Sequence, residues 1–207
     1  MTNNNHKILT DNIEKSYNGL ELVKPMIEEY LNGKIISVEE DNKNSQICKV
    51  LDMDCGIDAL IKYNTGNTTG LAIRVQPTKK NWRTFTTRLE RMTHKPTEYD
   101  KRKSSIVNDG SLYPYYTIQI YTNKNITEVI SFAIIKTTTL FERLDKGIFD
   151  GNIQSLINNQ DGSLFYPTPW NYFTNDEIYI YECKEEILQE MTQEEINQRL
   201  KELPKNS

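Results

Sequence analysis

The sequence of 207 residues is poor in the side chains that build metal centres and disulfide frameworks. It has three cysteines, Cys48, Cys55 and Cys183, and two histidines, His6 and His94. The cysteines are odd in number and share no C-x-x-C spacing, which disfavours both a disulfide framework and a structural zinc site. Because nitrogen ligands are so few, carboxylates would have to hold any catalytic metal, which favours magnesium or manganese.

Long apolar runs are also missing. No stretch approaches the roughly 20 apolar residues that span a bilayer, and the start, MTNNNHK, lacks the apolar segment of a signal peptide. We therefore expect a cytoplasmic protein with no membrane partner.

Several common functional motifs do not occur. The sequence contains no phosphate-binding glycine loop, zinc spacing, nucleophile elbow or dinucleotide fingerprint. Their absence excludes kinases, GTPases, zinc hydrolases and Rossmann dehydrogenases. Internal repeats and Pro/Gly/Ser linkers are absent too, so we expect residues 1–207 to form a single domain.

Charge is unevenly distributed along the chain. From Arg74 to Lys103 there are ten Lys or Arg against three acidic residues, a net charge of +7, which leaves −11 for the rest of a chain whose net charge is −4. Such a concentration steers anionic partners and predicts binding to nucleic acid, with DNA and RNA both left open. The predicted contact residues are Lys79, Lys80, Arg83, Arg88, Arg91, Lys101, Arg102 and Lys103. The alternative is a solvated hairpin and helix whose cations serve solubility.

Aromatic residues are interleaved with these cations. Trp82, Phe85 and Tyr99 lie among them, and aromatic faces among cations are what stacking on unpaired bases uses. Aromatics so spaced are more often part of a core. A second aromatic stretch, at 161–173, is rich in proline; we expect it to be a loop whose Trp170 is buried.

The apolar pattern predicts an α/β (α+β) domain with a mixed central β-sheet flanked by helices. Helices are expected at 11–32, where Pro25 bends or divides the helix, from Thr97 towards Gly110, at 138–146, and at 184–203, the last one acidic. Strands are expected at 34–40, 47–53, 56–63, 71–75, 83–91, 113–121, 126–135 and 177–181. In the helix that begins at Thr97, the exposed side is expected to carry residues 101–103.

Two short segments carry a resemblance to a known family. The first is Gly56-Ile57-Asp58 followed by Ala59-Leu60-Ile61, and the second is Ala72-Ile73-Arg74-Val75-Gln76. With a helix before them, a hairpin between them and a helix after them, residues 11–135 resemble the core of the PD-(D/E)XK nuclease superfamily, the restriction-endonuclease-like core. Residues 136–207 would be a C-terminal extension that completes the sheet and adds an acidic helix.

The resemblance implies that Asp58 binds a divalent metal, with Arg74 in the second acidic position and Gln76 in the position of the lysine. Phosphodiester hydrolysis needs a hard cation between the phosphate and the attacking water. The period-two alternation of strands projects Asp58, Arg74 and Gln76 toward one face of the sheet. A second carboxylate must then help to hold magnesium. The nearest candidates are Asp52 and Asp54, of which we choose Asp54, and the others are Glu21, Glu28 and Glu98.

Several functions remain open at this level. In a rearranged active nuclease, Asp58 and another carboxylate hold magnesium, Gln76 positions water and Arg74 stabilises charge on the phosphate. In an inactive module of the same fold, Arg74, Gln76 and the basic hairpin only bind the backbone. In a purely structural interpretation, Asp58 pairs with Arg74 across the hairpin.

A protein–protein inhibitor or adaptor that uses the acidic last helix and the aromatic loop is a further candidate, and a homo-oligomer is left open. Frequent Asn, Ile, Lys and Tyr suggest an AT-rich coding sequence. They motivate the hypothesis of a bacterial or phage protein of defence or counter-defence.

Overall fold

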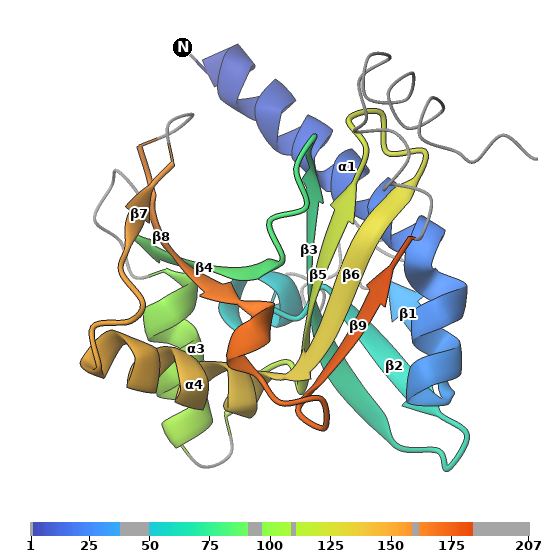
Figure 1. Ribbon diagram of the computed structural model, residues 1–207. Coiled ribbons are helices and arrows are strands. Elements are labelled where there is room, and N and C mark those ends of the chain that lie inside the picture. The colour runs from blue at the N-terminus through green and yellow to red at the C-terminus, as the bar shows by residue number, and fades with distance from the viewer. Residues whose placement is uncertain (1, 38–49, 91–96, 109–110, 159–161, 184–207) are drawn as a thin grey trace, which may run out of the picture.

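The computed structural model describes residues 2–37, 50–90, 97–108, 111–158 and 162–183, with side chains from residue 17 onward except those of 52 and 53. These residues form a six-stranded and a three-stranded sheet with helices around them (Figure 1). In spatial order, the large sheet contains β1 (Gly33–Ser37), β2 (Ala59–Tyr63), β3 (Thr68–Pro77), β5 (Tyr116–Thr122), β6 (Val129–Lys136) and β9 (Ile178–Glu182). The small sheet contains β4 (Thr84–Glu90), β8 (Leu164–Pro169) and β7 (Leu156–Ile157). The predicted fold class, a mixed sheet flanked by helices, is confirmed.

One face of the large sheet is covered by the long first helix, α1 (Thr2–Leu31), which continues through Pro25. Its side chains at a spacing of three and four are buried against the sheet, as expected of an amphipathic helix. These side chains are Leu20, Val23, Ile27 and Leu31. Burying each one contributes about 1.5–3 kcal/mol relative to leaving it exposed. The helix comes very close to β3, because a Cβ added at Gly19 would lie 2.4 Å from a methyl group of Val75.

Strand pairing places β3 in the middle of the large sheet. It pairs antiparallel with β2 through a hairpin and parallel with β5 on its other side. The chain reaches β5 through β4 and the helix α3 (Glu98–Val107), because a parallel neighbour requires a crossover. The residues of β3 that face away from α1 therefore look toward β4 and α3.

The second face of the large sheet packs on the small sheet and on α4 (Thr137–Phe149). Phe85 from β4, Tyr121 from β5 and Trp170 from the short 3-10 turn after β8 (Trp170–Tyr172) are almost completely buried there. The expectation that Trp170 is buried is confirmed.

Two predicted elements differ from the structure. The strand expected at 47–53 is wrong in its described part, because Val50–Asp54 forms a π-helical turn. Its backbone bonds are local: the Cys55 N–H donates to the Val50 carbonyl, five residues back, at 3.1 Å. Gly56 then adopts a φ of +63°, a conformation that glycine permits.

The proline-rich loop expected at 161–173 is partly a strand. In β8, Pro167 and Pro169 lie opposite Thr86 and Thr84 of β4. The two prolines are two residues apart, so both missing N–H groups lie on the same edge of the strand. β7 reaches only as far as Phe165 along that edge, which leaves room for the prolines.

Helix boundaries differ from the prediction: α1 begins at Thr2 instead of residue 11, and α4 ends at Phe149 instead of residue 146. α3 begins after Thr97 as predicted, but the Thr97 hydroxyl donates to the carbonyls of Arg88 and Leu89 and does not cap the helix. The helix ends at Val107, while Gly110 and the acidic helix expected at 184–203 lie outside the described residues. In the part of the chain that the structure describes, no helix has both the length and the apolar character to cross a membrane.

Candidate functional site

The alternation of β3 separates its side chains into two sets. Leu71, Ile73 and Val75 pack toward α1, in the core between that helix and the large sheet. Arg74 and Gln76 point to the opposite face, where β4 and α3 lie. Both are half-buried, and β5 places Gln119 and Tyr121 beside them.

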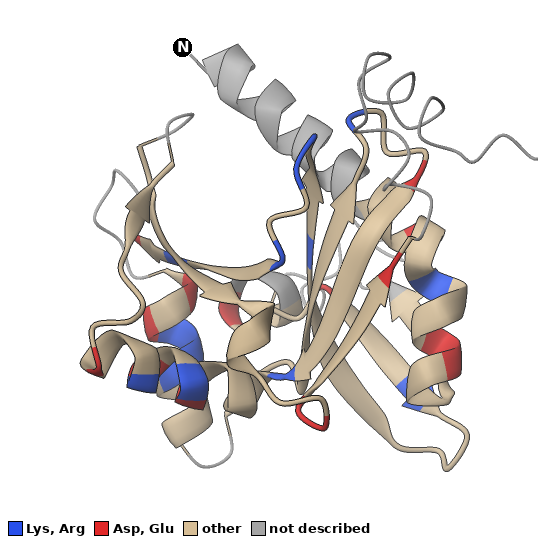
Figure 2. Cartoon of the chain, in the orientation of Figure 1, with Lys and Arg blue, Asp and Glu red and all other residues tan. Residues whose placement is uncertain are grey.

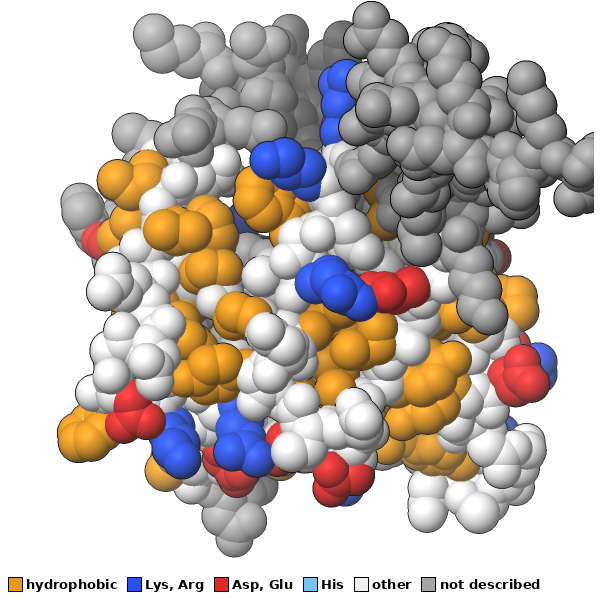
Figure 3. Space-filling model, viewed as in Figure 1, with side chains coloured by type: hydrophobic (Ala, Val, Ile, Leu, Met, Phe, Trp, Pro, Cys, Tyr) orange, Lys and Arg blue, Asp and Glu red, His pale blue; other side chains and the backbone are white. Residues whose placement is uncertain are grey.

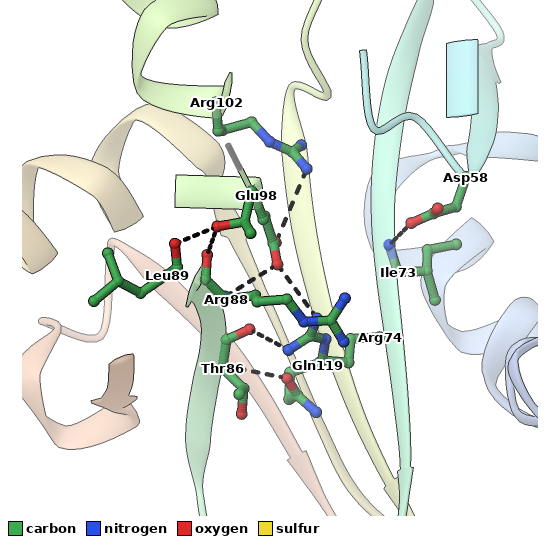
Figure 4. A network of polar contacts seen from close by, with 10 residues as sticks. Asp58, Ile73, Arg74, Thr86, Arg88, Leu89, Glu98, Arg102 and Gln119 are labelled. Carbon is green, nitrogen blue, oxygen red and sulfur yellow. Dashed lines mark hydrogen bonds and ion pairs between the residues drawn. The ribbon is translucent and has the colours of Figure 1, made fainter. Parts of the chain in front are cut away.

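Asp58 lies just before β2 and not within an apolar strand as predicted. Its backbone N–H donates to the Leu71 carbonyl at 2.9 Å, and its carboxylate Oδ2 accepts the Ile73 N–H at 2.6 Å. Figure 4 shows the carboxylate directed at the backbone of Ile73. Asp58 thus joins the start of β2 to β3 through hydrogen bonds with the backbone of β3.

Arg74 lies in a polar network centred on Glu98 (Figure 4). Its Nη1 donates to the Thr86 carbonyl at 2.8 Å, and its Nη2 lies 3.3 Å from Glu98 Oε2. The same carboxylate oxygen accepts the backbone N–H of Arg88 at 3.3 Å. Glu98 therefore ties β3, β4 and the first turn of α3 together.

Arg102 completes this network from inside the protein. The sequence placed it on the exposed side of α3, but it is only 7% exposed, and its Nη2 lies 3.9 Å from Glu98 Oε1. Burial lowers the pKa of the Arg102 guanidinium, while the carboxylates of Glu98 and Asp58 oppose that shift. Gly56 leaves the space for it, because a Cβ there would lie 2.6 Å from Arg102 Nη2.

Gln119 is the residue of this region that sequence reasoning missed. It is 1% exposed, lies opposite Arg74 in the parallel register, and accepts the Thr86 N–H at 3.4 Å. Its Nε2 finds no partner among the described residues. A glutamine inside the apolar run YTIQIY was the available signal, because a buried amide requires polar neighbours.

The carboxylates proposed as magnesium ligands do not converge among the described side chains, which do not include that of Asp52. Glu98 is engaged by Arg74 and Arg102. Asp54 lines an open hollow of about 430 Å³ beside α3 together with Asp100, Lys101, Ser104 and Ser105.

The two candidates on α1 are engaged elsewhere. Glu21 lies 3.0 Å from Lys24, and Glu28 binds Lys34 and the Ile35 N–H. In the described residues no three His, Cys, Asp or Glu side chains are arranged to hold a metal ion. Among the described side chains, Asp58 therefore belongs to no such group.

The basic stretch is divided among several environments (Figure 2). Arg74 and Arg102 belong to the Glu98 network, Arg83 forms an ion pair with Glu182 of β9, and Lys103 lies 2.7 Å from Asp145 of α4. Arg88 is half-buried in β4, Lys101 is exposed on α3, and Arg91 lies outside the described residues. On the face seen in Figure 3, cationic side chains form separate patches with apolar and neutral atoms between them.

The loop that joins β3 to β4, residues 78–83, differs from the rest of this stretch. Lys79 and Lys80 are exposed, and within the described residues neither forms an ion pair. Trp82 is 56% exposed, and the Lys80 ammonium lies 5.4 Å from the centroid of its ring. Of the three aromatics interleaved with cations, only Trp82 is exposed: Phe85 is buried and Tyr99 stacks on Phe141.

Comparisons with known proteins return no relative: no family model, no curated protein and no solved structure matches this chain.

Proposed function

We propose that the chain is a non-catalytic nucleic-acid-binding module that holds the sugar–phosphate backbone through the β3–β4 loop. The proposal rests on the contrast between the cation in the middle of β3 and the cations of the loop that follows it. In the middle of β3, Arg74 is held by Glu98 and the Thr86 carbonyl. Past the end of β3, Lys79 and Lys80 are exposed and have no counterion among the described residues. Ammonium groups of this kind attract phosphates and release their counterions.

The order of elements supports the proposed relationship to the nuclease-like core. A helix, a β2–β3 hairpin, a second helix and further strands follow one another in the order that the resemblance implies. At the position of the second acid, Arg74 brings a charge that repels a divalent cation and attracts phosphate. We place this activity in the cytoplasm, in bacterial or phage defence or counter-defence.

Fluorescence anisotropy with labelled DNA and RNA, each single-stranded and double-stranded, tests the proposal. We expect binding that weakens steeply with salt, that needs no magnesium and that leaves every substrate intact. Asp58→Asn should bind as the wild type does once its fold is confirmed by circular dichroism. Wild-type protein that binds none of these ligands at low salt would refute the proposal.

Magnesium-dependent hydrolysis of phosphodiesters is the second candidate. The place of Asp58 favours it, because Asp58 lies just before β2 and bonds to the backbone of β3, where the resemblance puts a metal ligand. Incubating the same substrates with magnesium and following them on a denaturing gel decides between the two candidates. Cleavage that disappears in Asp58→Asn would establish hydrolysis in place of simple binding.

A further inference from the structure

The β3–β4 loop exposes a tryptophan on a backbone that is fixed on both sides. Before Trp82, the Thr78 N–H donates to the Thr122 carbonyl at 2.9 Å, and the Asn81 carboxamide accepts a bond from the buried Ser131 hydroxyl at 2.9 Å. After it, the Arg83 carbonyl accepts the backbone N–H of Trp170 at 2.8 Å. In Figure 1 this segment runs from the end of β3 in the large sheet to β4 in the small one.

The backbone beside Trp82 is also strained. Arg83 has a φ of +50°, a left-handed conformation that side chains with a Cβ adopt rarely and at a cost of roughly 1–2 kcal/mol. The ion pair between Arg83 and Glu182 and the bond from Trp170 hold it there. Strain that the surroundings maintain is a feature of binding sites, and here it fixes the residue next to an exposed indole.

Cations accompany the indole on the same loop. Lys80 lies over the Trp82 ring, and the Lys80 N–H donates to the Thr78 hydroxyl at 2.9 Å, which fixes the lysine backbone as well. Lys79 is its exposed neighbour. An ammonium at one face of an indole stabilises the orientation of the ring and leaves its remaining surface to a second planar group.

We propose that Trp82 stacks on an unpaired base of a single-stranded nucleic acid while Lys79 and Lys80 contact the phosphates on either side of that base. The inference rests on the proposed function and adds its ligand class. Single strands are favoured over duplexes because the bases of a duplex already stack on each other, whereas an unpaired base has a free face. Stacking needs no base edge, so the preference for base sequence is weak, and DNA and RNA are separate arms of the test.

The test uses the full chain and labelled DNA and RNA strands of about 20 nucleotides, longer than the roughly 4–16 that such a site covers. Each strand is compared with its blunt duplex. We expect Trp82→Leu to weaken single-strand binding roughly 5- to 150-fold, the equivalent of 1–3 kcal/mol for one stacked base. Trp82→Phe keeps an aromatic face and should restore most of the affinity.

Intrinsic fluorescence gives a second readout, because the chain has two tryptophans and the other one, Trp170, is 2% exposed. Oligonucleotide should quench the emission of Trp82 in the wild type and leave the emission of Trp82→Phe nearly unchanged. An unaltered thermal unfolding midpoint in both variants excludes misfolding as the cause.

Two results separate failure of the inference from failure of the proposed function. If Trp82→Leu binds single strands as tightly as the wild type, or if duplexes bind as tightly as single strands, the stacking role is overturned and the binding module stands. If the wild type binds no nucleic acid in any arm, both are overturned.

Discussion

The middle of β3 and the loop at its end carry cations from the same basic stretch and use them in opposite ways. Arg74 and Arg102 lie around Glu98, where the three side chains join β3, β4 and α3. Lys79 and Lys80 lie a few residues further along and have no acidic partner among the described residues. A count of charges along the sequence cannot tell these cases apart, because burial and pairing decide whether a cation stabilises the fold or meets a partner.

Removing the central carboxylate should have the largest effect on stability. In Glu98→Gln, Arg102 stays buried without its nearest counterion and Arg74 loses its ion pair. Because Glu98 is 26% exposed, we expect a loss of about 2–4 kcal/mol in the free energy of unfolding, slightly under the range for fully buried pairs. Urea denaturation measures it, and Glu142→Gln, at an exposed position on α4, is the matched control. Equal midpoints for the two variants would show that the network contributes nothing.

A smaller loss is expected from closing the space that Gly56 leaves for Arg102. Gly56→Ala puts a Cβ 2.6 Å from Arg102 Nη2 at a φ of +63°, so the guanidinium must move away from Glu98. Gly66→Ala is the control, because its φ of +92° carries backbone strain with no atom within 4 Å of the added Cβ. We expect Gly56→Ala to cost about 1 kcal/mol more than Gly66→Ala in the same denaturation experiment. Equal losses in the free energy of unfolding for the two variants would show that the space at Gly56 does not matter to the Glu98 network.

The stabilisation from the ion pair of Lys103 should be lost only at high pH. The hydrogen bond to Asp145 raises the pKa of Lys103 above its ordinary value of 10.5. A raised pKa means that the native state holds the proton more tightly, so the stabilisation is complete below the unfolded pKa and is lost as pH rises through the folded pKa. The unfolding midpoint of the wild type should therefore converge on that of Lys103→Gln only as pH rises above 10.5. Parallel curves would contradict the pairing.

The smallest effect on stability belongs to the loop. Lys79→Gln with Lys80→Gln removes exposed charges that contact no acidic group among the described residues. We expect the free energy of unfolding to change by less than about 0.5 kcal/mol. Differential scanning calorimetry measures this change. A clear loss of stability would show that these lysines stabilise the fold, as Arg74 does.

The fold was predictable where the periodicity was strong. The helix that covers the sheet, the β2–β3 hairpin and the central strands β5 and β6 follow from apolar spacing that burial then enforces. The turn at Val50–Asp54 was not predictable. Its backbone hydrogen bond joins residues five apart, and the turn is followed by Gly56 with a positive φ. β8 was not predictable, because a strand tolerates proline only where no neighbouring strand needs its missing N–H, and the sequence does not show where that edge lies.

Most residues of the candidate site were predictable, although Gln119 was not, and the partners of these residues were not predictable. Sequence reasoning identified Asp58, Arg74 and Glu98, but their roles depend on contacts between elements far apart in the chain. Arg102 is the clearest case: it lies between two exposed lysines on α3, and only the packing of the helix buries it. Trp82 is the opposite case, because the interleaved pattern suggested stacking for three aromatics and only this one remains exposed.

The dependence of binding on salt tests most directly whether the loop cations, and not the total charge, bind the nucleic acid. Log affinity for a labelled single strand is plotted against log salt for the wild type, for the Lys79→Gln/Lys80→Gln variant and for a Lys62→Gln/Lys146→Gln variant. The last two lysines are exposed, and Lys62 lies opposite Thr68, at the far end of β3. We expect a slope shallower by about 1.4 for the loop variant, about 0.7 for each lost phosphate contact, and an unchanged slope for the control. Equal slopes for the two variants would contradict this expectation.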